Sequence, residues 1–309
     1  MTEYSQRLVQ PRQTLFGVPV WTSDPEQHWD AMILGVPADF GILGGVSAKT
    51  APAYLRAYSQ AVALEIESDG VSGSGWYDYE AGRTIGRGLR ICDAGNLLLN
   101  PFDGVEQIRC LNDLVRQFGS VAPMVVVLGG DHSLGYWLYR GRSDLALVHI
   151  DAHEDATDIT HEYPHHGNWV SYLDRGDGPA EIFQLGLRAL VPDRRRPPPS
   201  NRRLLRSMDA LEEGLRGISQ QEVCLSIDVD VLDPGLMPAV ASPYPGGWHP
   251  GKIREVVRAV RRSGKRIAVL DLCEFAPEPG KKDAVAALTL LHMLVHIICD
   301  ALAETESPR

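Results

Sequence analysis

Short apolar runs alternate with longer amphipathic stretches along most of this sequence. The runs consist mainly of Val, Ile and Leu and are bounded by Gly, Pro and Asp, a pattern typical of strands buried on both faces of a parallel sheet. We predict seven strands, over Ala31–Val36, Leu89–Cys92, Met124–Leu128, Leu145–Ile150, Ile182–Leu187, Glu222–Ile227 and Arg266–Leu270.

Helical periodicity occupies several segments between these runs. It predicts helices over Gly104–Phe118, Pro250–Ser263 and Asp283–Ala303, and the segment Ser133–Arg140 is a further helix candidate. Strands that alternate with helices favour right-handed crossovers, which place helices on both faces of one sheet. The predicted fold class is therefore α/β, a three-layer α/β/α sandwich around a mostly parallel sheet.

The length of 309 residues fits one large α/β domain or two small ones. We find no internal repeat and predict a single domain over 1–309, with an N-terminal extension over 1–30 and a frayed polar tail over 304–309. The biased segment RRRPPP (194–199) contains a proline run that cannot form helix interior, so it is expected to be an exposed loop.

The composition narrows the choice of partners. Hydrophobic residues make up 44% and charged residues 23%, which is ordinary for a globular protein. The formal net charge of −10 argues against non-specific binding of nucleic acid, which needs a basic surface. The N-terminus has no apolar core or cleavage signal, and we expect no stretch to approach the ~18 apolar residues of a membrane span. A cytoplasmic protein without nucleic-acid or membrane partners is expected.

The five cysteines are scattered and form no CxxC pair. Cys92, Cys224 and Cys273 lie within or beside apolar runs. We expect small buried side chains in a reducing compartment, in preference to a disulfide framework or a thiolate metal site.

Histidines and carboxylates follow four of the predicted strands. The segments concerned are GGDHS (129–133), DAHED (151–155), DVD (228–230) and DLCE (271–274). Because ligands of open α/β sheets collect beyond the carboxyl ends of the strands, we expect these groups to meet at one edge. Alternate residues of an extended chain point to the same side, so Asp151, His153 and Asp155 should face one way together, as should Asp228 and Asp230.

With His132, these five residues would form a cage of oxygen and nitrogen donors. Such a cage suits hard or borderline divalent ions, Mn²⁺ first and then Co²⁺, Ni²⁺ or Zn²⁺. Four aspartates brought this close repel one another unless cations neutralise them, and two divalent ions balance four negative charges. Each motif alone is a weak signal, and Asp233-Pro234 can be just a turn, but their coincidence at four strand ends predicts a two-metal site.

The motifs resemble the signature of the arginase/agmatinase (ureohydrolase) family. The similar segments are GGDHS, DAHED, SIDVDVLDP (226–234) and the Glu274 of DLCEFAP, with further likeness over 35–59, in HGNWVSYL (166–173) and in PGG (245–247). The resemblance implies the three-layer fold, a pair of manganese ions and a homo-oligomer, commonly a trimer or a hexamer. It also implies a small guanidino substrate, cleaved at a C–N bond to urea, or a substituted urea, and an amine.

Roles for individual residues follow from the same resemblance. One ion would be held by His132, Asp151, Asp155 and Asp228, and the other by His153, Asp151, Asp228 and Asp230, so that Asp151 and Asp228 bridge. Two such ions lower the pKa of a shared water and give hydroxide at neutral pH.

The remaining candidates act on the substrate. Asp155 is expected to hold the hydroxide in line with the guanidinium carbon, and Glu274 to pair with the guanidinium. Ser242 and Thr157 are expected to contact the substrate. His166, with an ordinary pKa of ~6.5, is the expected proton shuttle to the leaving amine, and it is also a substrate contact. The neighbouring histidines at positions 161 and 165 stay alternatives for the shuttle.

Other segments depart from the family pattern. Arginases carry Asn two residues after DxHxD and acids after G-L-R, whereas this chain has Thr157 and the apolar segment 189–192. Glu154 occupies a position at which the family usually has a smaller residue. The bulky Tyr163 and Trp169 are expected to narrow the entrance to the active site. We therefore predict an amidinohydrolase whose substrate is not L-arginine.

Two other classes are weighed against this prediction. A metal-binding homologue without activity, acting as a regulatory or assembly subunit, is the alternative, although the full ligand set argues against it. A nucleotide-binding α/β protein is disfavoured, because no GxGxxG follows the first strand and GILGG (41–45) lacks the Lys-Ser/Thr ending of a P-loop.

Overall fold

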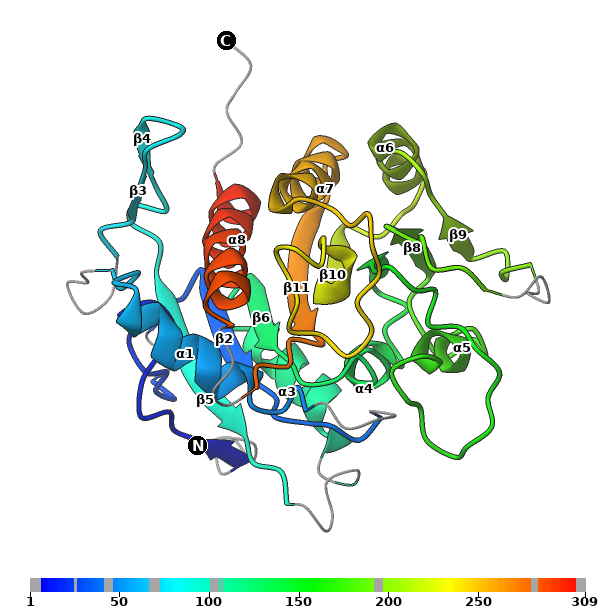
Figure 1. The fold of residues 1–309 in the computed structure, drawn as a ribbon, viewed down its shortest axis with the longest axis horizontal. Helices are drawn as coiled ribbons and strands as arrows, with labels where there is room; N and C mark the ends of the chain where they lie inside the picture. The colour runs from blue at the N-terminus through cyan, green and yellow to red at the C-terminus, as the bar shows by residue number, and fades with distance from the viewer. Residues whose placement is uncertain are drawn as a thin grey trace.

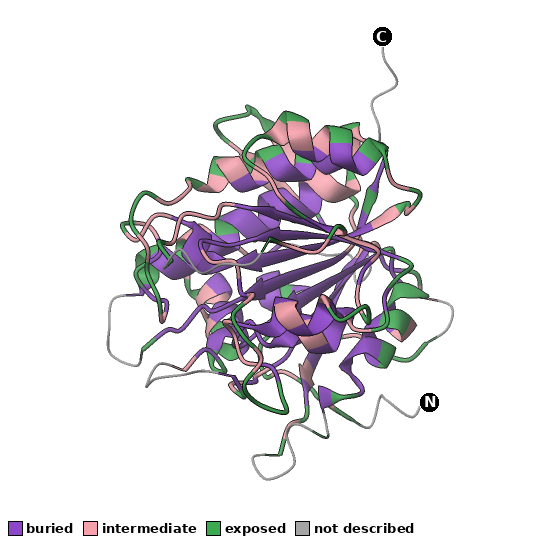
Figure 2. Cartoon of the chain, turned by 90° about the vertical axis from the view of Figure 1, so that its right-hand side faces the viewer, coloured by how far each residue is buried: buried purple, intermediate pink, exposed green. Residues whose placement is uncertain are grey.

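A nine-stranded sheet runs through the centre of the molecule, between two layers of helices (Figure 2). The computed structural model describes residues 7–24, 27–41, 47–66, 73–100, 106, 108–191, 197–278 and 283–303. The strand order is β1-β5-β2-β6-β11-β10-β7-β8-β9. Only β1 runs antiparallel to its neighbour, so the prediction of a mostly parallel sheet is confirmed.

All seven predicted strands are present; β6 has the predicted ends, and each of the other six is shifted at one end or at both. The strands of the sheet are β1 (Leu8–Val9), β2 (Ala31–Gly35), β5 (Ile91–Leu97), β6 (Met124–Leu128), β7 (Ala146–Ile150), β8 (Glu181–Leu185), β9 (Arg202–Leu204), β10 (Glu222–Asp228) and β11 (Arg266–Cys273). The short β1 and β9 were not predicted, nor was the separate hairpin of β3 (Trp76–Asp78) and β4 (Arg83–Ile85).

The largest shift concerns β5, which continues through Asp93 to Leu97. A carboxylate inside an apolar strand is costly to bury unless it is paired. Here Arg56 supplies the partner, with Nε 2.8 Å from Asp93 Oδ2 and both side chains buried. The predicted end of β8 at Leu187 was also wrong, because Gly186 turns the chain with a φ of 91°.

Helices cover both faces of the sheet, which confirms the three layers (Figure 1). On one face lie α1 (Ala51–Ala61), α6 (Met208–Arg216), α7 (Pro250–Arg262) and α8 (Ala284–Leu302). On the other face lie α3 (Leu111–Gly119), α4 (Leu134–Tyr139) and α5 (Trp169–Leu173). Two short 3-10 helices are η2 (Leu15–Gly17) and η3 (Val229–Val231).

Three of the predicted helices agree closely with those observed, whereas the one predicted over Gly104–Phe118 is interrupted by a turn at positions 109 and 110, after which α3 begins at Leu111. Those over 133–140, 250–263 and 283–303 correspond to α4, α7 and α8 within one residue at each end. The start predicted at position 104 and the arginines at 194–196 lie outside the described residues.

Helix α8 corrects one expectation. Its 19 residues are long and apolar enough to cross a membrane, by length and composition alone. In the structure 61% of that apolar window is buried, because α8 packs between α1 and α7 (Figure 1). We describe it as a core helix. The polar residues His292, His296 and Asp300 interrupt its sequence and hide the apolar length from a count of consecutive residues.

The four strands that precede the candidate motifs are consecutive neighbours, in the order β6-β11-β10-β7. Their ends lie level: Leu128 pairs with Leu272, Asp228 with Cys273, and Ile227 with Ile150. The register therefore brings the residues that follow each strand to one point on the edge of the sheet.

Candidate metal centre

Six side chains converge at this edge from the ends of three strands, β6, β7 and β10. His132 lies between β6 and α4, Asp228 ends β10, and Asp230 lies in η3. The remaining three, Asp151, His153 and Asp155, follow β7. Five of the six are buried, and His153 is 29% exposed at its side chain. Every residue predicted to bind metal is thus in one cluster.

One half of the cluster is centred on His132. Its Nδ1 lies 3.2 Å from Asp228 Oδ2, 3.3 Å from Asp151 Oδ2 and 3.4 Å from Asp155 Oδ2. One nitrogen thus faces three carboxylate oxygens, and these are the four donors predicted for one ion. The Nε2 of the same ring lies 2.9 Å from the Ser226 hydroxyl, which in turn donates to Asp271 Oδ1, so the ring is held from behind.

The other half is centred on His153. Its Nδ1 lies 2.8 Å from Asp230 Oδ2 and 3.5 Å from Asp151 Oδ1. Asp151 therefore presents one oxygen to each histidine, which is the arrangement of a bridging ligand. Asp151 Oδ1 and Asp228 Oδ1 also accept backbone hydrogen bonds, of 2.6 Å from the N–H of His153 and of 2.8 Å from the N–H of Asp230, so the bridging role of both carboxylates stays a prediction.

We expected these side chains to share a face because they alternate along extended chain, but the backbone at these positions is not extended. Asp155 has a φ of 51°, in the left-handed region, so the segment 151–155 is a turn. Asp230 is in a 3-10 helix that Asp228 caps. The predicted grouping is correct, but local turns produce it, and the alternation argument was wrong.

The four aspartates give the cluster an excess of negative charge. Burial and the neighbouring Asp151 raise the pKa of Asp230 to about 7, and burial raises the pKa of Asp228 well above its usual range. Hydrogen bonds to Asp151 and then Asp230 raise the pKa of His153 to about 11. The raised pKa values mean that these side chains bind protons, and the protons offset the repulsion among the four adjacent carboxylates. Oxygen and imidazole ligands suit divalent cations, and two sets of such donors lie close enough to hold one: Asp151, His153 and Asp230, and His132, Asp151 and Asp155 together with His149.

Glu274 lies directly beside this cluster. Its Oε1 accepts a hydrogen bond of 2.7 Å from the backbone N–H of His132 and lies 3.6 Å from His166 Nδ1. Glu274 has a φ of 68° and Asp155 one of 51°, a conformation that residues other than glycine rarely adopt. Such backbone strain is concentrated at functional sites.

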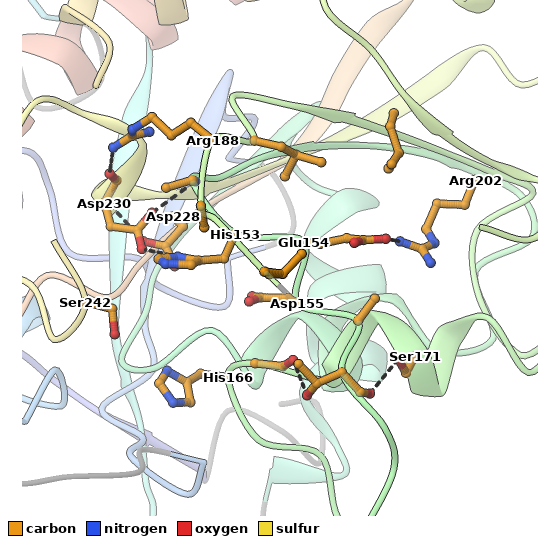
Figure 3. Close-up of a pocket in the computed structure, with 18 of the residues that line it drawn as sticks. His153, Glu154, Asp155, His166, Ser171, Arg188, Arg202, Asp228, Asp230 and Ser242 are labelled. Atoms are coloured by element: carbon orange, nitrogen blue, oxygen red, sulfur yellow. Dashed lines mark hydrogen bonds and ion pairs between the residues drawn. The ribbon is translucent and has the colours of Figure 1, made fainter. Parts of the chain in front are cut away.

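The structure separates the three histidines of the loop before α5. His166 lines the cavity in front of the cluster (Figure 3), and the carboxylate of Glu274, 3.6 Å from its Nδ1, raises its pKa. His165 Nδ1 accepts a hydrogen bond from the Gly167 backbone, and burial lowers its pKa. His161 is exposed. Neither of these two lines the cavity, so the geometry favours His166 as the shuttle.

The two other substrate candidates differ from each other. Ser242 lines the cavity and is exposed (Figure 3). Thr157 also lines it, but its hydroxyl donates a hydrogen bond of 2.8 Å to the carbonyl of Gly167. The Thr157 hydroxyl therefore fixes the loop that carries His166.

Trp169 does not narrow the entrance, contrary to expectation. Its side chain is fully buried, and its Nε1 donates a hydrogen bond of 2.9 Å to Asp155 Oδ2. The helix α5 places this ring behind the metal cluster, because its apolar face packs on the sheet. Tyr163 is 40% exposed and does not line the cavity.

Sequence reasoning missed a polar cluster behind the site, formed by His149, Glu154, Asp174, Gln184 and Arg202. His149 precedes Asp151 by two residues on the same strand, so alternation was a signal for its direction. No local signal existed for Gln184 and Arg202, which lie on β8 and β9.

The cavity in front of the cluster is open and has a volume of about 1460 Å³. Of the six candidate metal residues, His153, Asp155, Asp228 and Asp230 line it (Figure 3). The segments that follow α5, β8 and β9 add the exposed arginines Arg175 and Arg206 and the apolar Leu190 and Val191 to its lining. The space exceeds the volume of a small guanidino compound, so the apolar and cationic groups are available to bind the rest of a substrate.

The sequence profile of the Arginase family matches residues 29–299. A formimidoylglutamase of Halobacterium salinarum is 26% identical, over 95% of this chain and 97% of its own length. A guanidinopropionase of Pseudomonas aeruginosa is also 26% identical, over 88% of each chain.

Among solved structures, the proclavaminate amidino hydrolase of Streptomyces clavuligerus has a similar fold. Its TM-score is 0.69 at 22% identity, over 96% of this chain and 99% of that one. The similar fold agrees with the nine-stranded sheet and the two helical layers. The profile covers far more than half of the chain and includes all the residues of the buried cluster, so this protein is a member of the Arginase family.

Proposed function

We propose that this protein is a binuclear metal-dependent amidinohydrolase that cleaves a guanidino or formimino C–N bond of a substrate other than L-arginine. The observation that carries the proposal is the bridging geometry of Asp151, whose two oxygens face His132 and His153. A carboxylate shared between two histidine-carboxylate groups is the arrangement that a pair of divalent ions requires.

The metal residues would be the six of the cluster, His132, Asp151, His153, Asp155, Asp228 and Asp230. When bound, two divalent ions supply a hydroxide nucleophile at neutral pH and stabilise negative charge at the reacting carbon. Manganese is the ion that we propose, because the set contains four carboxylates and no thiolate.

The remaining groups bind and protonate the substrate. Asp155, held by Trp169, accepts a hydrogen bond from the attacking oxygen. Glu274, fixed by the His132 backbone, pairs with the guanidinium through a charge-assisted hydrogen bond. His166, next to Glu274, donates a proton to the leaving amine. Ser242, across the cavity, contacts the guanidinium group.

The residues that line the far part of the cavity support a proposal for the substrate class. Leu190 and Val191 line it and offer no side-chain hydrogen bond to an α-ammonium group. Arg175 and Arg206 line it as exposed cations, which attract a carboxylate. We therefore propose a guanidino or formimino carboxylic acid without a free α-ammonium group, a choice supported by the names of the two relatives.

Steady-state kinetics would test this choice. The panel contains L-arginine, agmatine, 3-guanidinopropionate, 4-guanidinobutyrate, guanidine, N-hydroxy-L-arginine and N-formimino-L-glutamate, with Mn²⁺, Co²⁺ or Ni²⁺ added. Release of urea, hydroxyurea or formamide is measured as each substrate requires. We expect the highest kcat/KM on a compound that bears a carboxylate and no free α-ammonium group. The highest kcat/KM on L-arginine would show that the interpretation of segments 156–166 and 189–191 is wrong.

The alternative is a metal-binding homologue without activity, which serves as a regulatory or assembly subunit. It predicts two bound ions and no turnover of any compound in the panel. The cytoplasmic location and the trimeric or hexameric assembly also stay proposals, which localisation of the native protein and light scattering of the purified protein would test.

A further inference from the structure

A row of buried polar side chains leads from β9 to Asp151. Arg202 Nη1 donates to Gln184 Oε1 at 2.9 Å, Gln184 Nε2 lies 2.8 Å from His149 Nδ1, and His149 Nε2 lies 3.0 Å from Asp151 Oδ2. Gln184 and His149 are fully buried, and Arg202 is 6% exposed. The row ends on the oxygen that Asp151 presents to His132.

The partners of Gln184 determine where the protons lie. Arg202 only donates, so the group that faces it must be the amide oxygen. The backbone carbonyl of Glu154 only accepts, so the group that faces it, at 2.8 Å, must be the amide nitrogen. The same amide nitrogen donates to His149 Nδ1. His149 Nδ1 is therefore an acceptor, and the ring proton lies on Nε2, which donates it to Asp151.

Two carboxylates balance the buried charge of Arg202. Glu154 Oε1 lies 2.6 Å from Arg202 Nη1, and Asp174 Oδ2 lies 3.1 Å from Arg202 Nε. In Figure 3 the Glu154 side chain extends toward Arg202 and away from Asp155. Glu154 of the DAHED motif thus pairs with Arg202 behind the metal residues and is not a metal ligand itself.

We propose that Arg202, Gln184 and His149 are positioning residues that fix the bridging carboxylate of Asp151. Arg202 and the Glu154 carbonyl orient the Gln184 amide, the amide selects the tautomer of His149, and the Nε2–H of His149 stops rotation of Asp151. This inference rests on the proposed function in one respect, because it requires Asp151 to be a metal ligand. Groups that orient metal ligands in this way change metal affinity by about 10–100-fold when they are removed.

Binding of Mn²⁺ to the full-length protein, measured by calorimetry with chelator competition, tests the chain of contacts. Gln184→Met removes the amide at similar volume, and His149→Phe removes the donor but keeps a ring. We expect Gln184→Met to weaken Mn²⁺ binding about 10-fold and His149→Phe about 10- to 100-fold. His149→Gln, which retains a donor, should recover part of the loss.

A double-mutant cycle separates positioning from general damage. If Gln184 acts through His149, the double variant should bind Mn²⁺ no more weakly than His149→Phe alone. The matched control is Asn112→Leu, since Asn112 is also a buried amide and donates to the carbonyls of Leu138 and Arg140, away from the cluster. This control should lower the melting temperature and leave Mn²⁺ affinity unchanged.

The outcomes are distinguishable. Equal effects of Gln184→Met with and without His149, or full Mn²⁺ affinity in His149→Phe, would overturn the positioning role while the wild type still binds two ions. A wild-type protein that binds no Mn²⁺, Co²⁺ or Ni²⁺ would overturn the proposed function and the inference together.

Discussion

The indole of Trp169 donates a hydrogen bond to Asp155 Oδ2, the oxygen that also lies 3.4 Å from His132 Nδ1. The ring centroid of Trp169 is 4.9 Å from that of His132, so one buried side chain contacts two candidate ligands. Asp155 has a left-handed backbone, and the indole holds the carboxylate that this backbone directs inward.

Trp169→Phe keeps most of the packing and removes this donor. We expect kcat to fall about 10-fold or more, because Asp155 can rotate away from the attacking oxygen. Trp137→Phe is the matched control, since Trp137 is buried in the same apolar core. Equal losses of kcat in the two variants would attribute the effect to packing alone.

Metal content is the next prediction. The reconstituted protein should hold two divalent ions per chain, and a chelator should abolish activity. Asp228→Ala should be the most damaging single change, because it removes a predicted bridge and leaves the other acids unbalanced. Elemental analysis measures the ratio, and a value of one or less after full reconstitution contradicts a binuclear site.

Replacement of His166 by Ala should lower kcat about 10²- to 10⁴-fold and leave metal content unchanged. The reason is its position, 3.6 Å from Glu274 and facing the cavity. His161→Ala and His165→Ala serve as controls and should keep near wild-type kcat. Wild-type kcat in His166→Ala would mean that another of these histidines, or no histidine, shuttles the proton.

The pH dependence of kcat should have two limbs. Activity should rise toward alkaline pH as the nucleophilic water ionises, and fall again as His166 loses its proton. Because the carboxylate of Glu274 raises the pKa of His166, the protonated form persists above its usual range and is lost only as pH rises through the raised value. Glu274→Gln should move the alkaline limb to lower pH, as measured at saturating substrate. An unmoved limb would exclude His166 as the group that titrates there.

The sequence predicted the central strands well because burial on both faces leaves an unambiguous signal. β6 is continuous in apolar residues, β7 is interrupted by His149 alone, and both strands were predicted within one position. β9 reads Arg-Arg-Leu, which carries no such signal, and it exists because it pairs with β8. Polar Asp93 within β5 depends on Arg56, a partner that lies 37 residues away.

The candidate ligands were also predictable, since their grouping follows from the parallel register of β6, β10 and β7 around β11. The residues and backbone conformations that hold these ligands in place could not be predicted from the sequence. The positive φ values of Asp155 and Glu274 are properties of the folded loops, and local sequence preference opposes them. The contact between Gln184 and His149 joins two strands, and Trp169 reaches Asp155 only after α5 packs on the sheet. Such partners are set by tertiary structure.

The apolar helix α8 has a consequence for how the protein is made. It packs against α1 and α7, and the ribosome completes both of these before α8 emerges. Until then their apolar residues, such as Leu55 and Val256, lack the cover that they have in the core. Nascent chains of this kind expose hydrophobic surface during synthesis and are natural clients of chaperones. Leu294 is a fully buried residue of α8. A polar substitution there should therefore lower the soluble yield in cells, although Leu294 is not one of the metal residues.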